Sequence, residues 1–211
     1  NTEMLVFIIE IIGTVAFASS GAMVGIRKKM DIFGVIVMAV MTAVGGGIIR
    51  DLVLGIHPPN TFKDPIYVEY SVATAVILFM IFYIRKQMLD SKAMFYYERI
   101  MILLDAIGLG AFTVIGVETA YEIGFVHHRF LLLFVGVITG VGGGMIRDMM
   151  AQQIPFILVK QIYACASLIG AGVCIWLMPY HKSASMILGA VVVVIIRILA
   201  ATYRWDLPKI D

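Results

Sequence analysis

Two nearly identical strings of glycine, arginine and aspartate are the residues best suited to bind or pass a solute. Residues 42–51 run Thr-Ala-Val-Gly-Gly-Gly-Ile-Ile-Arg-Asp, and residues 139–148 run Thr-Gly-Val-Gly-Gly-Gly-Met-Ile-Arg-Asp. Eight of the ten positions are identical, at an offset of 97 residues. An arginine beside an aspartate offers donors to a carboxylate and oxygens to an ammonium group. The strings therefore predict a duplicated solute site.

Each string carries three consecutive glycines: Gly45, Gly46, Gly47 and Gly142, Gly143, Gly144. Small residues let membrane helices approach closely, so close packing is one interpretation. Three glycines in a row also lower helix propensity by about 1 kcal/mol each. A kink or unwound turn, with its carbonyls buried or facing a water-filled path, is therefore the other interpretation.

Four charged residues close the strings: Arg50, Asp51, Arg147 and Asp148. Neighbouring residues on a helix point about 100° apart, so we expect neither arginine to pair with its adjacent aspartate. Acids buried in hydrocarbon are generally paired or face water. We expect Glu10 to pair with Arg50, and Asp105 with Arg147, at the two mouths of one path. Alternatively, one pair is structural and only the other lines the path.

Other polar residues in the apolar segments have two interpretations each. Thr42 and Thr139 either satisfy a backbone carbonyl of their own helix or offer a hydroxyl to a passing cation. Lys63 and Lys160 follow Pro58 and Pro155 by five residues, and either lie at opposite mouths or extend to the interface. We expect Arg197 to extend its side chain to the membrane surface.

The composition predicts that bilayer surrounds these residues. Of the 211 residues, 61% are hydrophobic and only 14% are charged, and the mean hydropathy is +0.98. A typical soluble domain has about 45–50% apolar and about 25% charged residues. A helix needs about 20 apolar residues to cross the membrane. Seven segments qualify: 4–25, 32–54, 66–84, 99–118, 130–150, 156–178 and 184–203.

The distribution of lysine and arginine predicts the direction of the spans. The connections after the first and third spans, together with the C-terminal tail, are the most basic. We therefore expect a multi-pass protein of the inner (plasma) membrane with its N-terminus outside and its C-terminus in the cytoplasm.

A second match supports an internal repeat. Glu10, Gly13, Ala16-Phe17 and Gly21 align with Asp105, Gly108, Ala111-Phe112 and Gly116 at an offset of 95. We expect one all-α membrane domain over 1–211, with repeats at 4–84 and 99–178 and a seventh helix at 184–203. Because each half has three spans, the halves form a 3+3 inverted-topology repeat, a plan that usually places a solute path at the interface of the repeats.

Several classes are not supported by the sequence. The glycines follow no strand and lack a phosphate-loop pattern, and no metal-ligand spacing occurs. The net charge of +2 gives no reason to expect nucleic acid. We expect no enzyme activity, no cofactor and no bound metal other than transient K⁺.

The doubled G-G-G-x-[IV]-R-D motif, with G-x-x-A-F before each copy, resembles a prokaryotic membrane family labelled by its repeated domain as a glycine transporter. That family is similar to the trimeric intracellular cation (TRIC-type) channels. The resemblance covers about residues 5–203. It implies a homotrimer in the lipid bilayer, with one pore inside each protomer and glycine triplets that bend the second and fifth helices around it.

Two functions from different classes remain. The first is a channel for monovalent cations, with K⁺ favoured by the resemblance. The second is a transporter of glycine or another small zwitterion, because inverted repeats are a usual transporter plan. A membrane scaffold or enzyme is the weakest alternative.

Overall fold

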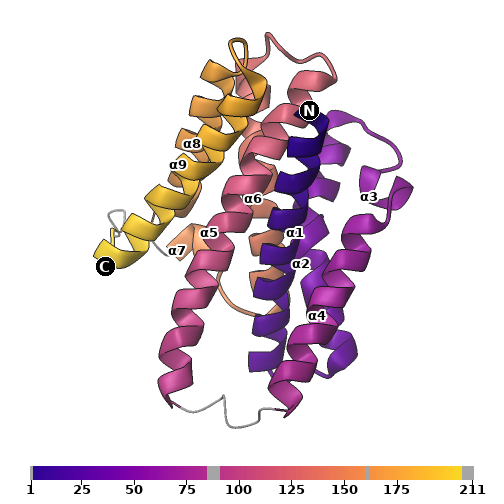
Figure 1. Cartoon of the computed structure of the whole chain (residues 1–211), viewed down its shortest axis with the longest axis vertical. Coiled ribbons are helices and arrows are strands. Elements are labelled where there is room, and N and C mark those ends of the chain that lie inside the picture. The colour runs from indigo at the N-terminus through magenta and orange to yellow at the C-terminus, as the bar shows by residue number, and fades with distance from the viewer. Residues whose placement is uncertain (1, 85–90, 160–161, 206–211) are drawn as a thin grey trace.

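The protein is a bundle of α-helices (Figure 1). The computed structural model describes residues 2–84, 91–159 and 162–205. The helices in these ranges are α1 (Thr2–Arg27), α2 (Ile32–Leu54), α3 (Asn60–Lys63), α4 (Ile66–Ile84), α5 (Ser91–Glu122), α6 (Arg129–Met150), α7 (Phe156–Val159), α8 (Tyr163–Leu177) and α9 (Lys182–Tyr203).

Six of the described helices are long and apolar enough to cross a membrane: α1, α2, α4, α5, α6 and α9. The apolar helix α8 is shorter, at 15 residues. Six predicted spans therefore correspond to helices of spanning length, and α8 lies in the remaining predicted segment, 156–178. The exposed surface carries many large apolar side chains, among them Phe33, Ile77, Trp176 and Ile195, as a lipid-facing surface requires.

The prediction of one continuous helix at 156–178 is wrong. The structure has two helices there, the single turn of α7 and the longer α8. Ile162, just before α8, has φ −68° and ψ 71°, and this ψ lies outside the helical range. Helix α5, by contrast, has 32 residues and begins well before the predicted start at 99.

The helices form two groups of three with similar packing. Helix α4 packs against α1 and α2, and α8 packs against α5 and α6. The groups meet where α1 contacts α5 and α2 contacts α6. Helix α9 packs on α5 and α8, at the side of the bundle away from α4 (Figure 1). The strings of glycine, arginine and aspartate therefore lie in the two helices at the centre of the bundle.

An aromatic pair lies where the groups meet. The rings of Phe17 and Phe112 are 5.3 Å apart between centroids. Each ring packs against a glycine of the opposite helix, Phe17 against Gly108 and Phe112 against Gly13. All four residues belong to the second sequence match, so equivalent residues make equivalent contacts.

Candidate functional site

The glycine triplets form the crossing point of α2 and α6. A Cβ built on Gly46 would lie closer than 3.0 Å to the carbonyl oxygen of Thr139. A Cβ built on Gly143 would lie equally close to the carbonyl oxygen of Thr42. Real Cβ atoms do not tolerate such distances, so only glycine allows these backbones to touch. Close packing is therefore the structural role of the central glycine of each triplet.

The predicted unwound turn is not formed. Every residue of both triplets belongs to an uninterrupted α-helix, α2 or α6. The neighbouring glycines Gly45 and Gly142 also face the opposite helix, against Ile146 and the Cα of Gly46. Contact with the other helix compensates the low helix propensity of the glycines, which is why the helices continue through them.

The two threonines satisfy carbonyls of their own helices. Thr42 Oγ1 donates to the Met38 carbonyl, and Thr139 Oγ1 donates to the Val135 carbonyl, both at 2.6 Å. Both threonines are buried. This contact matches the first of the two interpretations and leaves their hydroxyl protons committed.

The adjacent arginines and aspartates do pair, so the expectation that they would not is wrong. Arg50 Nε lies 2.8 Å from Asp51 Oδ1, and Arg147 Nε lies 2.8 Å from Asp148 Oδ1. The Cβ atoms diverge around the helix, but the arginine stem is long enough to bring the guanidinium back to the next residue. Helical direction alone was a poor guide to the reach of arginine.

Each aspartate also fixes the chain that follows its helix. Asp51 Oδ2 accepts the backbone N–H of Asn60 at 2.7 Å, and Asp148 Oδ2 accepts that of Phe156 at 2.9 Å. These N–H groups belong to the first residues of α3 and α7, where helical N–H groups lack partners within the helix. The aspartates therefore join the arginines to the short helices.

An open cavity with several charged side chains in its wall is lined mostly by residues of the first half of the chain. We call Glu10, Arg50, Asp51 and Tyr67 the first-half site. A cavity of about 310 Å³ is lined by three of these residues, Glu10, Arg50 and Tyr67, and by Gly47, Lys63, Asp64 and others. Glu10 is half-buried and accepts a hydrogen bond from the Tyr67 hydroxyl.

The predicted ion pair between Glu10 and Arg50 is not formed between these described residues. Instead, the Glu10 carboxylate accepts a hydrogen bond from the Tyr67 hydroxyl, and the Arg50 guanidinium donates to the Asp51 carboxylate. Both charged groups instead face the same cavity. Lys63, at the end of α3, also lines this cavity, whereas its predicted counterpart Lys160 lies outside the described residues.

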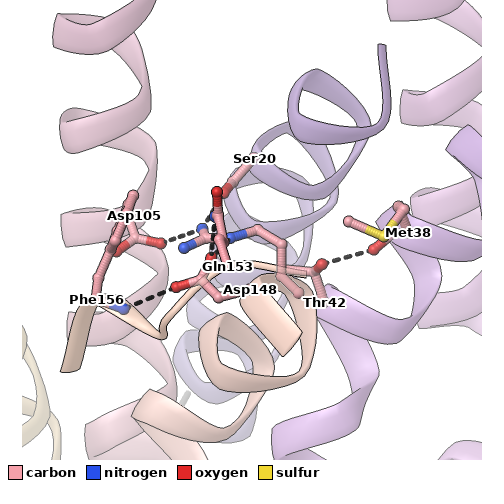
Figure 2. Close-up of polar contacts among 8 residues, drawn as sticks. Ser20, Met38, Thr42, Asp105, Asp148, Gln153 and Phe156 are labelled. Atoms are coloured by element: carbon pink, nitrogen blue, oxygen red, sulfur yellow. Dashed lines mark hydrogen bonds and ion pairs between the residues drawn. The ribbon is translucent and has the colours of Figure 1, made fainter. Parts of the chain in front are cut away.

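In the second half of the chain the equivalent arginine, Arg147, is buried among polar partners. We call Asp105, Arg147, Asp148 and Tyr163 the second-half site. Arg147 Nη1 lies 2.6 Å from Asp105 Oδ1, which confirms this predicted pair. The same Nη1 donates to Ser20 of α1. Its partners Asp105, Ser20 and Asp148, labelled in Figure 2, belong to three helices, α5, α1 and α6, and Arg147 is only 1% exposed.

The two sites therefore differ in state although their sequences match. Arg50 borders a cavity, and Arg147 is enclosed by Asp105, Asp148 and Ser20. Whether either set of residues lines a path stays a prediction at this point.

Two tyrosines of the sites were not among the predicted site residues. Tyr67 and Tyr163 occupy equivalent positions, because Ile66-Tyr67, Ser71 and Ala75 match 162–163, 167 and 171 at an offset of 96. Tyr67 binds Glu10, and the Tyr163 hydroxyl lies near Asp105 and Arg147 around Gly144. Extending the search for repeats to the third span of each half would have found both.

The fold and its polar centre define an all-helical membrane protein with a duplicated charged site between two glycine-packed helices. The family model described as "Glycine transporter" matches residues 7–83 and 102–179, once in each half. The UPF0126 inner membrane protein YadS of Escherichia coli K12 is 38% identical over 97% of this chain and 96% of its own length. The UPF0126 membrane protein YvgT of Bacillus subtilis is 32% identical over 96% and 95%.

Solved structures of TRIC channels have the same fold. A prokaryotic TRIC channel crystallised in 0.5 M KCl has a TM-score of 0.87 and 34% identity, covering 97% of this chain and 100% of that one. The TRIC trimeric intracellular cation channel orthologue from Rhodobacter sphaeroides has a TM-score of 0.84 and 31% identity, covering 95% and 98%. The chain belongs to this glycine-transporter, TRIC-like family.

Proposed function

We propose that the protein is a cation channel that favours K⁺, with a conduction path inside each protomer. The likeness to TRIC cation channels along nearly the whole chain carries this proposal. The path begins at the cavity of the first-half site and continues along the crossing of α2 and α6 to the second-half site. In this proposal the first site is the open end of the path and the second site is the closed end.

The charges around the cavity favour a cation. The guanidinium of Arg50 is neutralised by its contact with Asp51. The other charged groups of the lining are the carboxylates Glu10 and Asp64 and the ammonium of Lys63. With Asp51 counted beside Arg50, these groups have a formal net charge of −1. A charged cleft with low-dielectric walls concentrates ions of opposite sign.

The second-half site acts as the closed end of the path. Opening requires the Arg147 guanidinium to leave Asp105, because this contact joins α6 to α5 inside the bundle. A bend of α2 and α6 at the glycine triplets is the movement we propose for that step. Gly47 leaves room for it, because the nearest atom to a Cβ built there is Arg50 Nη2 at 3.9 Å.

The same proposal includes topology and assembly. We propose an inverted 3+3 repeat with α9 added, and the N-terminus outside the inner membrane. The first-half site is then the outer mouth and the second-half site the inner mouth. We also propose a homotrimer, which is supported by the trimeric relative from Rhodobacter sphaeroides.

A carrier for glycine or another small zwitterion is the second candidate. The cavity supports it, because a carboxylate, a guanidinium and an ammonium face a volume of about 310 Å³, large enough for a small amino acid. The description of the family model points the same way.

Flux into liposomes distinguishes the two candidates. If the protein is a channel, purified protein in proteoliposomes should release trapped K⁺ down its gradient. The rate of K⁺ release should not change when glycine is added outside. Saturable uptake of labelled glycine without K⁺ release would reject the channel and support the carrier.

Replacing Glu10 with glutamine is expected to reduce the K⁺ flux by about twofold to tenfold, because it removes one negative charge from the cavity wall. The Tyr67 hydroxyl still has an oxygen to donate to in this variant. The change is measured as the initial rate of K⁺ release at equal protein density. Glu69→Gln serves as the matched control, since Glu69 is exposed on α4 and does not line the cavity. Equal rates for both variants would contradict the placement of Glu10 in the path.

A further inference from the structure

Arg197 of α9 is buried within the bundle, although we expected it to extend to the membrane surface. Its exposed fraction is 3%. The residue lies six positions before the end of α9 at Tyr203, so it lies about 9 Å inside the helix end. A charge buried at membrane depth is costly, and such residues generally face the interior of the bundle, where they are candidates for a functional role.

The guanidinium of Arg197 stacks over the ring of Tyr163, with Cζ 4.6 Å from the ring centroid. This distance is within the range of a cation–π interaction. The hydroxyl of the same tyrosine points to the centre of the second-half site. A Cβ built on Gly144 would lie 3.1 Å from Tyr163 Oη, 3.8 Å from Arg147 Nη2 and 3.9 Å from Asp105 Oδ1, so the three groups gather around one point.

The second-half site next to Arg197 has an excess of carboxylates. Among the described residues, this site holds two carboxylates, Asp105 and Asp148, and one guanidinium, Arg147, all at most 2% exposed. One guanidinium against two carboxylates leaves a formal charge of −1. Arg197 stacks on the fourth member of the site, Tyr163, and brings the formal charge to zero.

Among the described residues, no arginine is seen to stack on Tyr67 as Arg197 stacks on Tyr163. Helix α9, which carries Arg197, lies outside the two matched halves. The wall of the first-half cavity keeps two carboxylates, Glu10 and Asp64, against Lys63 once Arg50 is paired with Asp51. The helix outside the repeat therefore makes two equivalent sites unequal in charge.

We propose that Arg197 is a positioning and charge-balancing residue of the second-half site, through which α9 makes conduction depend on the direction of the current. This inference rests on the proposed channel function. Arg197 holds the ring of Tyr163 in place and cancels the excess negative charge there. Without it, cations would enter from the second-half side more readily, because a negative mouth raises their local concentration.

The test compares single-channel K⁺ currents at equal and opposite voltages in planar bilayers with symmetric KCl. Arg197→Met keeps a long side chain but removes the charge, and is expected to change the ratio of the two currents by at least about twofold. Arg197→Lys keeps the charge and should retain the wild-type ratio. Arg197→Met with Asp105→Asn restores a neutral site and should return the ratio toward wild type, and it gives a result if the single variant fails to fold.

The outcomes are distinct. An unchanged current ratio in Arg197→Met overturns the proposal. An altered current ratio in the double variant, whose site is neutral, also overturns it. Equal losses of thermal stability in the Met and Lys variants, without a change in the ratio, indicate a structural residue only. A wild-type protein with no unitary current rejects the channel function itself and the inference with it.

Discussion

Replacing Gly143 with alanine is expected to destabilise the folded protein by about 1–3 kcal/mol or more. The new methyl group would meet the carbonyl oxygen of Thr42 closer than 3.0 Å and the ring of Phe17 at 3.0 Å. The carbonyl belongs to the backbone of α2, so the two helices would have to separate. Thermal unfolding of the purified protein in detergent, followed by size-exclusion chromatography, measures the loss.

Gly47→Ala is the matched control for this prediction. Gly47 belongs to the equivalent triplet, and its nearest contact for a new Cβ is Arg50 Nη2 at 3.9 Å, an ordinary van der Waals distance. We expect a change in stability of no more than about 0.5 kcal/mol from packing at this position, beyond the gain in helix propensity. Similar unfolding temperatures for Gly143→Ala and the wild type would contradict the close crossing of α2 and α6.

Replacing Arg147 with glutamine is expected to be the second large change. It leaves Asp105 and Asp148 buried without their shared cation, and breaking a buried ion pair costs about 3–5 kcal/mol. The lost ion pairs are those that we propose to hold the second-half site closed. K⁺ release from proteoliposomes should therefore rise, and the unfolding temperature should fall. Both quantities are measured on the same preparation.

Two comparisons separate the ion pair from general damage. The double variant Arg147→Gln with Asp105→Asn should lose less stability than the sum of the single variants, because it leaves one buried carboxylate fewer without a partner. Arg50→Gln should cost less than Arg147→Gln, since Arg50 borders the cavity and pairs only with Asp51. Strict additivity, or equal effects at Arg50 and Arg147, would contradict the different states of the two sites.

The repeat and most of the helices could be predicted because they depend on local properties of the chain. Apolar length identified the spans, and the glycine triplets marked the crossing of α2 and α6. The predicted span at 156–178 was divided by the non-helical ψ of Ile162, a backbone feature that an apolar run does not reveal. The pairing of Asp105 with Arg147 was predictable, since buried charges of opposite sign at equivalent depth have few other partners.

The contacts of the first-half site depended on three-dimensional competition that the sequence does not display. Glu10 met the Tyr67 hydroxyl, and Arg50 folded back onto Asp51, so the symmetric pair was not formed. The burial of Arg197 was missed for a related reason. An arginine within reach of a helix end extends to water unless another helix covers it, and here the ring of Tyr163 lies beneath it.

The proposed cation-selective channel along the two sites is tested most directly by recording the wild-type protein in planar bilayers under a KCl gradient. Such a channel should give unitary currents that reverse close to the equilibrium potential of K⁺. A reversal close to the equilibrium potential of Cl⁻, or no unitary current from protein that takes up glycine saturably, would contradict it.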